Sequence, residues 1–268
     1  MGDSWRHRKR SRAVVRRVSP NFTNALASYF GTGPTDVSLS QAAHDDFVSA
    51  LKENDVDVDI LPGLSEYPDC TFVEDTAVVV GDVVVITNVG HPSREGEQLA
   101  IKEYLQTHID VVQMPLGAKM DGGDVVFFDD RFLVGVSTRT NREGVEFLRE
   151  VVTERGFDLI EFQIPESTLH LTTVCSSPRP GTIVAAEGHL TPEHFRTLED
   201  EGVEILWVPN EEAYAANTIG FENGNLLVSR GYPHTKKILE NAGFSVRVVD
   251  MEHIRAADGS LTCLSIFF

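Results

Sequence analysis

The sequence is poor in cysteine, and its few cysteines are badly spaced for a metal site or a disulfide framework. Cys70, Cys175 and Cys263 are an odd number, and no two of them form a CxxC pair. Zinc sites and small disulfide-rich domains rely on such paired spacings. Free thiols suit a reducing compartment, so we expect a cytoplasmic protein with no metal, in which one thiol is free to react.

Long apolar runs and an excess of positive charge are also lacking. No stretch approaches the roughly 18 apolar residues of a membrane-spanning helix. Aspartate and glutamate number 41 against 23 lysines and arginines, which gives a formal net charge of −18. Such a chain repels nucleic acid and anionic membranes and favours cationic ligands. The composition therefore predicts neither a nucleic-acid partner nor a membrane partner.

The positive charge that is present gathers at the N-terminus. The run RHRKRSR lies within residues 1–12, and no apolar stretch of the kind found in secretory signals follows it. We interpret residues 1–12 as a basic tail that frays, although an address signal or a nucleic-acid arm has a similar composition. Nothing like a linker interrupts residues 13–268, which are expected to form one catalytic domain.

A unit of two strands, a helix and a third strand recurs along this domain. Four units follow one another, and a fifth combines the C-terminal LTCLSIFF with a strand, a helix and a strand from the N-terminal part. Such a repeat predicts a closed radial array of five ββαβ units around a central channel. An ordinary doubly wound α/β sheet predicts neither the hairpins nor the period. Equivalent positions, at separations of 49, 46, 47 and 46 residues, are Asp75, Asp124, His170, Asn217 and Cys263.

Local patterns predict details of these units. Asn223-Gly224 between two apolar runs is typical of a hairpin turn. In the helix expected over residues 91–108, we place Leu99, Ile101 and Leu105 on the apolar face.

Residues with reactive side chains stand at or next to the equivalent positions, so a closed array brings them together in the channel. Singly, a cysteine near a C-terminus or a histidine in a strand is more often a buried core residue. Together they combine a thiol and an imidazole with carboxylates, which accept the forked N–H donors of a guanidinium in pairs. The residues are Glu74, Asp75, Asp121, Asp124, His170 and Cys263.

Five segments in the expected order carry a family resemblance. PDCTFVEDTAVV, MDGGDVVF, STRTNREG, LHLTTVCS and DGSLTCLSIFF resemble the signature segments of dimethylarginine dimethylaminohydrolase, from the guanidino-group-modifying (pentein) superfamily. The resemblance runs from residue 13 to the C-terminus and implies the five-bladed pentein α/β propeller. It also implies hydrolysis of methylated arginine to citrulline and methylamine or dimethylamine through a covalent cysteine intermediate. The enzyme would need no cofactor and would act as a monomer or homodimer.

The same resemblance implies roles for single residues. Cys263 is expected to be the nucleophile, His170 the acid/base, and Asp121 the residue that orients His170. The substrate-binding residues implied are Asp69, Glu74 and Asp75 around the guanidinium, Arg94 and Arg139 at the α-carboxylate, Leu26 in a covering loop, and Ala257 through its carbonyl.

Two positions distinguish the chain from arginine deiminases of the same fold. Those enzymes have aspartate where Thr172 stands and arginine where Glu74 stands, and both differences favour the dimethylarginine enzyme. The alternatives are an arginine deiminase or amidinotransferase, and a non-catalytic pentein resembling translation initiation factor six. The last would have no Cys–His pair in the channel.

Overall fold

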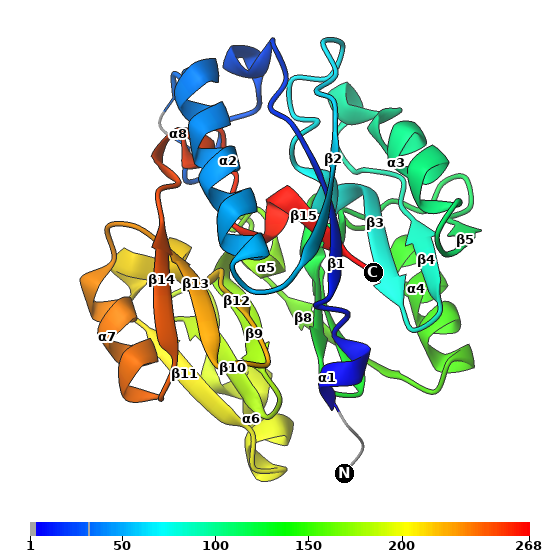
Figure 1. The fold of residues 1–268 in the computed structure, drawn as a ribbon. Coiled ribbons are helices and arrows are strands. Elements are labelled where there is room, and N and C mark those ends of the chain that lie inside the picture. Colours follow the sequence, from blue (N-terminus) through cyan, green and yellow to red (C-terminus); the bar gives the residue numbers. More distant parts are fainter. Residues whose placement is uncertain (1–3, 32) are drawn as a thin grey trace.

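Five three-stranded sheets make up the computed structural model, which describes residues 4–31 and 33–268 (Figure 1). In each sheet the second strand lies between the other two, antiparallel to the first and parallel to the third. A helix leads from the second strand to the third, as a parallel connection requires. Each sheet with its helix is one blade, so the predicted ββαβ repeat is confirmed.

Four blades are continuous in the chain. The first two are β3 (Ala77–Val80), β4 (Val83–Ile86), α3 (Glu97–Leu105) and β5 (Asp110–Gln113), and then β6 (Val125–Phe128), β7 (Arg131–Val136), α4 (Arg142–Glu154) and β8 (Asp158–Gln163). The third is β9 (Cys175–Arg179), β10 (Thr182–Ala186), α6 (Pro192–Asp200) and β11 (Glu204–Val208). The fourth is β12 (Ile219–Gly220), β13 (Asn225–Ser229), α7 (Pro233–Asn241) and β14 (Ser245–Val249).

The fifth blade joins the two ends of the chain. It consists of β15 (Ser265–Phe267), β1 (Arg12–Arg16), α2 (Val37–Lys52) and β2 (Asp57–Leu61). β1 pairs with β15 in antiparallel register, with Val15 opposite Ser265. The two terminal segments thereby complete the fifth blade within one sheet.

A ring of five short helices marks the centre of the array. Each immediately precedes or leads into the first strand of a blade: η2 (Val73–Thr76), η4 (Gly122–Asp124), α5 (Leu171–Val174), η5 (Asn210–Ala216) and η6 (Thr262–Leu264). Contacts join η6 to η2, η2 to η4, η4 to α5 and α5 to η5. Asn217 closes it, because its amide donates to the carbonyl of Thr172 at 2.7 Å and to Oγ1 of Thr262 at 2.9 Å. All five equivalent positions predicted from the repeat lie in or beside this ring.

The apolar core lies between the blades and under their helices. Middle strands are the most buried, as in β4 and β10, whereas third strands such as β5 lie half-exposed at the rim. The placement of Leu99 on the apolar face of α3 is wrong: it is 62% exposed, while Ile101 and Leu105 are buried. Residues two apart point to different sides of an α-helix, so Leu99 cannot share a face with Ile101.

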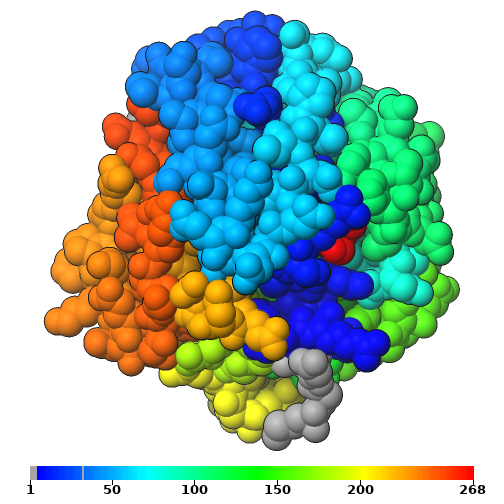
Figure 2. All heavy atoms as spheres, in the orientation of Figure 1, coloured from blue at the N-terminus to red at the C-terminus, as the bar shows by residue number. Residues whose placement is uncertain are grey.

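The remaining helices are α1 (Ser4–His7), η1 (Phe22–Asn24), η3 (Pro92–Arg94) and α8 (Glu252–Arg255). The expectation of a frayed basic tail is wrong for the residues around α1, because Arg8 is only 5% exposed. Residues 1–3 of that tail lie outside the described residues. Figure 2 shows the N-terminal residues, in dark blue, lying across the lower centre of the molecule beside the red C-terminal residues. Within the described ranges, no helix is both long enough and apolar enough to cross a bilayer.

Candidate active site

A small cavity lies on one side of the ring of short helices, which we call the front; with its open mouth, it holds about 340 Å³ of empty space. Its lining brings together residues from all along the chain: Leu26, Asp69, Phe72, Asp75, Arg94, Arg139, Leu169, His170, Ala257, Asp258, Gly259 and Cys263. Eight of the ten site residues expected from the sequence are in this set. Glu74 and Asp121 are not, because they lie behind the residues that face the cavity.

Cys263 reaches the front cavity from η6. Its side chain is buried, and Sγ lies 3.2 Å from Oγ of Ser260. Burial, together with the charges of Glu74 and Asp75, raises the pKa of the Cys263 thiol well above its ordinary value. With the cavity empty, Cys263 is therefore a protonated thiol at neutral pH. A cation entering the cavity would offset the two carboxylates and favour the thiolate.

His170 lies beside a carboxylate that fixes its ring. Nε2 of His170 is 2.9 Å from Oδ2 of Asp121, and the other carboxylate oxygen of Asp121 accepts from the backbone N–H of Gly90 at 2.6 Å. Burial alone lowers the pKa of His170, but Asp75, the hydrogen bond to Asp121 and the charge of Asp124 raise it to about 9. His170 is thus an imidazolium at neutral pH and can donate a proton.

The glycines of MDGGD are required by close packing around this pair. A Cβ on Gly123 would lie 2.7 Å from Nδ1 of His170 and 2.8 Å from Oδ1 of Asp75. A Cβ on Gly122 would lie 2.1 Å from the carbonyl oxygen of Glu74. Neither site has room for a side chain, so these glycines allow η2 and η4 to approach each other.

Asp75 is held by a buried arginine. Nη1 of Arg94 donates to Oδ2 of Asp75 at 2.5 Å, and Nη2 donates to Glu97 at 2.8 Å and to the carbonyl of Phe72 at 3.0 Å. Arg94 therefore lies between two carboxylates, which raise its pKa further against the effect of burial. Removing one partner of such a buried pair typically costs about 3–5 kcal/mol.

Of the two arginines that line the front cavity, Arg139 is held less tightly than Arg94. Its side chain is 12% exposed, and its contact with Oδ2 of Asp121 is long, at 3.4 Å. Ala257, which the sequence also places in the site, is buried and lines the same cavity. The structure thus brings Arg139 together with Ala257 and Cys263 of the C-terminal segment.

A loop after η1 covers the cavity, and one carboxylate that the sequence analysis missed fixes it. Asp258 accepts from the backbone N–H groups of Ser28 at 2.5 Å, Tyr29 at 3.1 Å and Gly31 at 2.5 Å. Leu26, in the same loop, donates its N–H to Oδ1 of Asp69 at 3.1 Å. The Asp-Gly dipeptide of DGSLTC is a turn signal, but nothing in the sequence indicates which backbone groups it binds.

Glu74 and Thr172 lie on the opposite side of the ring. Oε2 of Glu74 accepts from Oγ1 of Thr262 at 2.9 Å and from Oγ1 of Thr172 at 3.4 Å. Burial and the neighbouring Asp75 raise the pKa of Glu74 to about 8. Thr172, which we expected at the deiminase aspartate position, contacts Glu74 from behind the cavity lining.

Asp124, although at an equivalent repeat position, is bound within the scaffold. Its carboxylate accepts from the hydroxyls of Ser137 at 2.5 Å and Thr140 at 2.6 Å and from the N–H of Leu171 at 3.1 Å. Burial raises its pKa to about 6 despite these donors. Asp124 thus links η4 to α5 and fixes the backbone next to His170.

One group of residues has the spacing of metal ligands, but its geometry has another explanation. Ligand atoms of Asp75, Asp121 and His170 lie within 4.8 Å of one another. The imidazole already bonds to Asp121, and the Arg94 guanidinium already supplies a cation to Asp75. Hydrogen bonding and ion pairing account for the cluster.

The chain is similar to known proteins over nearly its whole length. The family model for eukaryotic N,N dimethylarginine dimethylhydrolase matches residues 35–266. The N(G),N(G)-dimethylarginine dimethylaminohydrolase of Pseudomonas aeruginosa is 30% identical over 95% of this chain and 98% of its own. The enzyme of the same name from Streptomyces coelicolor is 29% identical over 95% of this chain and 96% of its own.

A solved structure agrees with these matches. It is the P. aeruginosa enzyme, as a cysteine-to-serine mutant complexed with citrulline, which superposes with a TM-score of 0.88 at 28% identity, covering 96% of this chain and 99% of that one. The five-bladed fold and its central site define a protein of the guanidino-group-modifying (pentein) class. Within that class, the chain belongs to the dimethylarginine dimethylaminohydrolase family.

Proposed function

We propose that this protein hydrolyses N-omega-methylated arginine to citrulline and methylamine or dimethylamine, with Cys263 as nucleophile and His170 as acid/base. The observation that carries the proposal is that Cys263 and His170, from different blades, line one small cavity beside Asp69 and Asp75. Carboxylates of this kind bind a planar cation, and the thiol and imidazole lie where its central carbon would be placed.

The substrate's two ends would meet different groups. Asp69 and Asp75 face the cavity and would accept the guanidinium N–H donors, with the carboxyl group of Glu74 behind them. Arg139 would bind the α-carboxylate, helped by the second Nη1 N–H of Arg94, since the other N–H groups of Arg94 bond to Asp75, Glu97 and the Phe72 carbonyl. The carbonyl of Ala257 would accept from the α-amino group, and Leu26 would cover the bound substrate.

The first chemical step forms a C–S bond. Binding of the cationic guanidinium lowers the pKa of Cys263, and the thiol proton passes to solvent. The thiolate attacks the central guanidinium carbon, giving a tetrahedral adduct. The C–N bond to the methylated nitrogen then breaks while the His170 imidazolium protonates the leaving amine. A covalent thiouronium on Cys263 and a neutral His170 result.

The second step breaks the C–S bond. Neutral His170, held by Asp121, takes a proton from water, and the resulting hydroxide attacks the thiouronium carbon. The C–S bond breaks, citrulline leaves, and the sulfur regains a proton. Asp121 stabilises the imidazolium each time it forms.

A substrate panel tests the proposal. Release of the ureido product is measured with asymmetric dimethylarginine, monomethylarginine and arginine, which give citrulline, and with agmatine, which gives carbamoylputrescine. We expect the methylated arginines to be hydrolysed with a kcat/KM at least roughly tenfold above that of arginine, or ~1.4 kcal/mol. Faster release of ammonia from arginine would instead assign the protein as a deiminase. Amidine transfer to an added amine would indicate an amidinotransferase.

Several further points belong to the same proposal. Residues 13–268 act as one catalytic domain, because β1 and β15 close the fifth blade. The reaction takes place in a reducing compartment such as the cytoplasm, since all three cysteines are free thiols.

The protein works as a monomer or homodimer, which light scattering of the pure protein would determine. Binding to ribosomes in place of hydrolysis would favour a non-catalytic protein.

A further inference from the structure

The hydroxyl of Ser260 lies against the sulfur of Cys263, with a distance of 3.2 Å from Oγ to Sγ. Both side chains are buried, with exposed fractions of 1% for Ser260 and 6% for Cys263. Among the described residues, no other residue hydrogen-bonds to this sulfur, and the hydroxyl of Ser260 has no other partner. Ser260 is not part of the lining of the front cavity. It therefore contacts the nucleophile without facing the space that the substrate would fill.

The local backbone explains why the two side chains meet. Cys263 lies in η6, and Leu261, just before that helix, has the right-handed helical conformation, with φ −57° and ψ −50°. Ser260 is three residues before Cys263, and residues three apart lie on the same side of a 3₁₀-helical turn. The spacing in the sequence SLTC thus directs the Ser260 hydroxyl to the sulfur.

Hydrogen bonds on both sides hold the backbone around Ser260. The carbonyl of Gly259, just before it, accepts from the hydroxyl of Tyr214 at 2.5 Å. The N–H of Thr262, two residues after it, donates to Oδ1 of Asn217 at 3.0 Å. The Ser260 hydroxyl is therefore in place before any charge develops on the sulfur, and a donor held in this way needs no reorganisation during the reaction.

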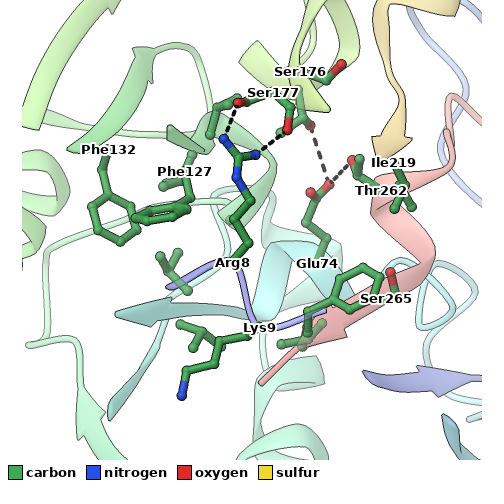
Figure 3. A pocket seen from close by; sticks show the side chains of 18 of the residues that line it. Arg8, Lys9, Glu74, Phe127, Phe132, Ser176, Ser177, Ile219, Thr262 and Ser265 are labelled. Atoms are coloured by element: carbon green, nitrogen blue, oxygen red, sulfur yellow. Dashed lines mark hydrogen bonds between the residues drawn. The ribbon is translucent and has the colours of Figure 1, made fainter. Parts of the chain in front are cut away.

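Two threonine hydroxyls of the ring face the other way, toward a second cavity, which we call the rear cavity (Figure 3). With its open mouth, it holds about 930 Å³ of empty space, and it shares no lining residue with the front cavity. Its lining includes four residues of the basic N-terminal segment: His7, Arg8, Lys9 and Arg10. Figure 3 shows the hydroxyl of Thr262 bonded to Glu74 in this cavity, and Thr172 contacts the same carboxyl group. Ser260, by contrast, keeps its hydroxyl for Cys263.

A serine hydroxyl can serve both protonation states of the sulfur. Its oxygen carries one O–H donor and two lone pairs. While Cys263 is a thiol, the S–H can donate to Oγ of Ser260. Once Cys263 is a thiolate, the O–H of Ser260 turns and donates to the sulfur. Hydrogen bonds to ionised groups are stronger than those between neutral groups, so the contact favours the thiolate.

The other groups around Cys263 do not replace this donor. Burial, Glu74 and Asp75 raise the pKa of Cys263, whereas the hydrogen bonds from Ser260 lower it. Burial also raises the pKa of Tyr214 well above its ordinary value, so this phenol stays neutral. The remaining titratable groups at or just behind the front cavity are Asp69, Arg94, Asp121, Arg139, His170 and Asp258. The three cations among them each contact a carboxylate, and none is hydrogen-bonded to the sulfur.

We propose that Ser260 is a further catalytic residue: its hydroxyl donates a hydrogen bond to the Cys263 thiolate and stabilises the nucleophile until it attacks. The same hydroxyl stabilises the sulfur again when the C–S bond breaks in the second step. Ser260 acts only as a donor, and the thiol proton still passes to solvent. The inference rests on the proposed function for the reaction that the thiolate carries out, whereas the hydrogen bond itself can be measured without turnover.

Variants at residue 260 test the role of the hydroxyl. Ser260→Ala and Ser260→Gly lack the donor, and Ser260→Thr keeps a hydroxyl. Ser265→Ala is the matched control, because Ser265 is a second buried serine, two residues after Cys263, that lines the rear cavity. Its hydroxyl has no hydrogen-bond partner among the described residues. Thermal melts establish that each variant folds.

The primary readout is alkylation of Cys263 by chloroacetamidine, a small cation, with the site of the label confirmed by mass spectrometry. At saturating reagent the alkylation rate should rise with pH to a plateau, and the midpoint reports the ionisation of Cys263 beside a bound cation. In Ser260→Ala and Ser260→Gly the midpoint should move to higher pH by at least about half a unit, with the plateau rate maintained. Ser260→Thr should restore part of the shift, and Ser265→Ala should leave the midpoint unchanged.

An unmoved midpoint in folded Ser260→Ala or Ser260→Gly would overturn the inference. A lower plateau at an unmoved midpoint would overturn it too, because it would show that Ser260 only supports the packing of the site.

Citrulline release from methylated arginine gives the second readout. The acidic limb of the kcat profile should move to higher pH in Ser260→Ala, and kcat at pH 7 should fall roughly threefold to tenfold. KM should change little, because Ser260 is not part of the cavity lining. If the wild type hydrolyses no guanidino compound, the proposed function fails, and the alkylation midpoint still decides whether Ser260 stabilises the thiolate.

Discussion

At the front of the channel, charged side chains lie against opposite charges: Arg94 between Asp75 and Glu97, and His170 on Asp121. At the rear, Glu74 rests on two threonine hydroxyls, and the nearby cations come from the N-terminal segment. Both ends belong to the same ring of short helices. The difference teaches that repeat symmetry fixes where side chains converge, whereas the local charge partners decide which of them can react.

The two cysteines that line the cavities give the largest expected contrast between the ends. Cys263 lines the front cavity and Cys175 the rear one. Cys263→Ser should fold and lose on the order of 10³-fold or more in turnover, because a serine hydroxyl there has no base strong enough to ionise it. Cys175→Ala, the matched control, should keep near-normal citrulline release.

Labelling sharpens the same contrast. A cationic haloacetamidine should alkylate Cys263 first, since the front carboxylates attract it and Cys175 is completely buried. Mass spectrometry locates the label. A label on Cys175, or normal turnover by Cys263→Ser, would remove Cys263 from the mechanism.

The second-largest expected effect concerns the pair formed by His170 and Asp121. Asp121→Asn removes a carboxylate that raises the pKa of His170 toward 9. The imidazolium is then lost at lower pH, so the alkaline limb of the kcat profile should shift to lower pH. Turnover near neutral pH should fall roughly 10²-fold. Asp121→Glu should recover part of it, and an unshifted alkaline limb would contradict the role of Asp121.

A smaller effect is expected at Arg139, at the outer part of the front cavity. Arg139→Ala should raise KM roughly tenfold to 100-fold with a smaller change in kcat, because the lost contact is made before and during reaction alike. Arg142→Gln, at an exposed arginine of α4, is the control. A substrate analogue without the α-carboxylate should be insensitive to Arg139→Ala; equal losses with both substrates would assign Arg139 to the scaffold.

The smallest effect concerns the covering loop. Asp258→Ala removes the acceptor of three backbone N–H groups and should raise KM several-fold. Limited proteolysis should then cut faster within residues 26–31. Asp258→Asn is the milder variant, because asparagine also tolerates the positive φ of 61° at this position and keeps one acceptor. Unchanged proteolysis in Asp258→Ala would show that the loop is held by other contacts.

The sequence predicted the five-blade plan because the plan is periodic. Alternating β-branched runs, helices and turn residues such as Asn223-Gly224 are local signals, and the constant spacing of Asp75, His170 and Cys263 placed them in one ring. The family motifs added the other site residues. Eight of the ten line the front cavity, and Glu74 and Asp121 lie directly behind it.

Only the tertiary structure decided how these side chains are paired and which way they face. Asp121 and Asp124 are three residues apart, yet one bonds to His170 and the other to scaffold hydroxyls. Asp258 binds a loop more than 200 residues away, and the basic segment around Arg8 packs into the rear of the channel. The partners of these side chains depend on contacts between segments that are distant in the sequence, so only the folded chain determines them. Periodicity depends on residues that are close in the sequence, so the sequence alone is enough to predict it.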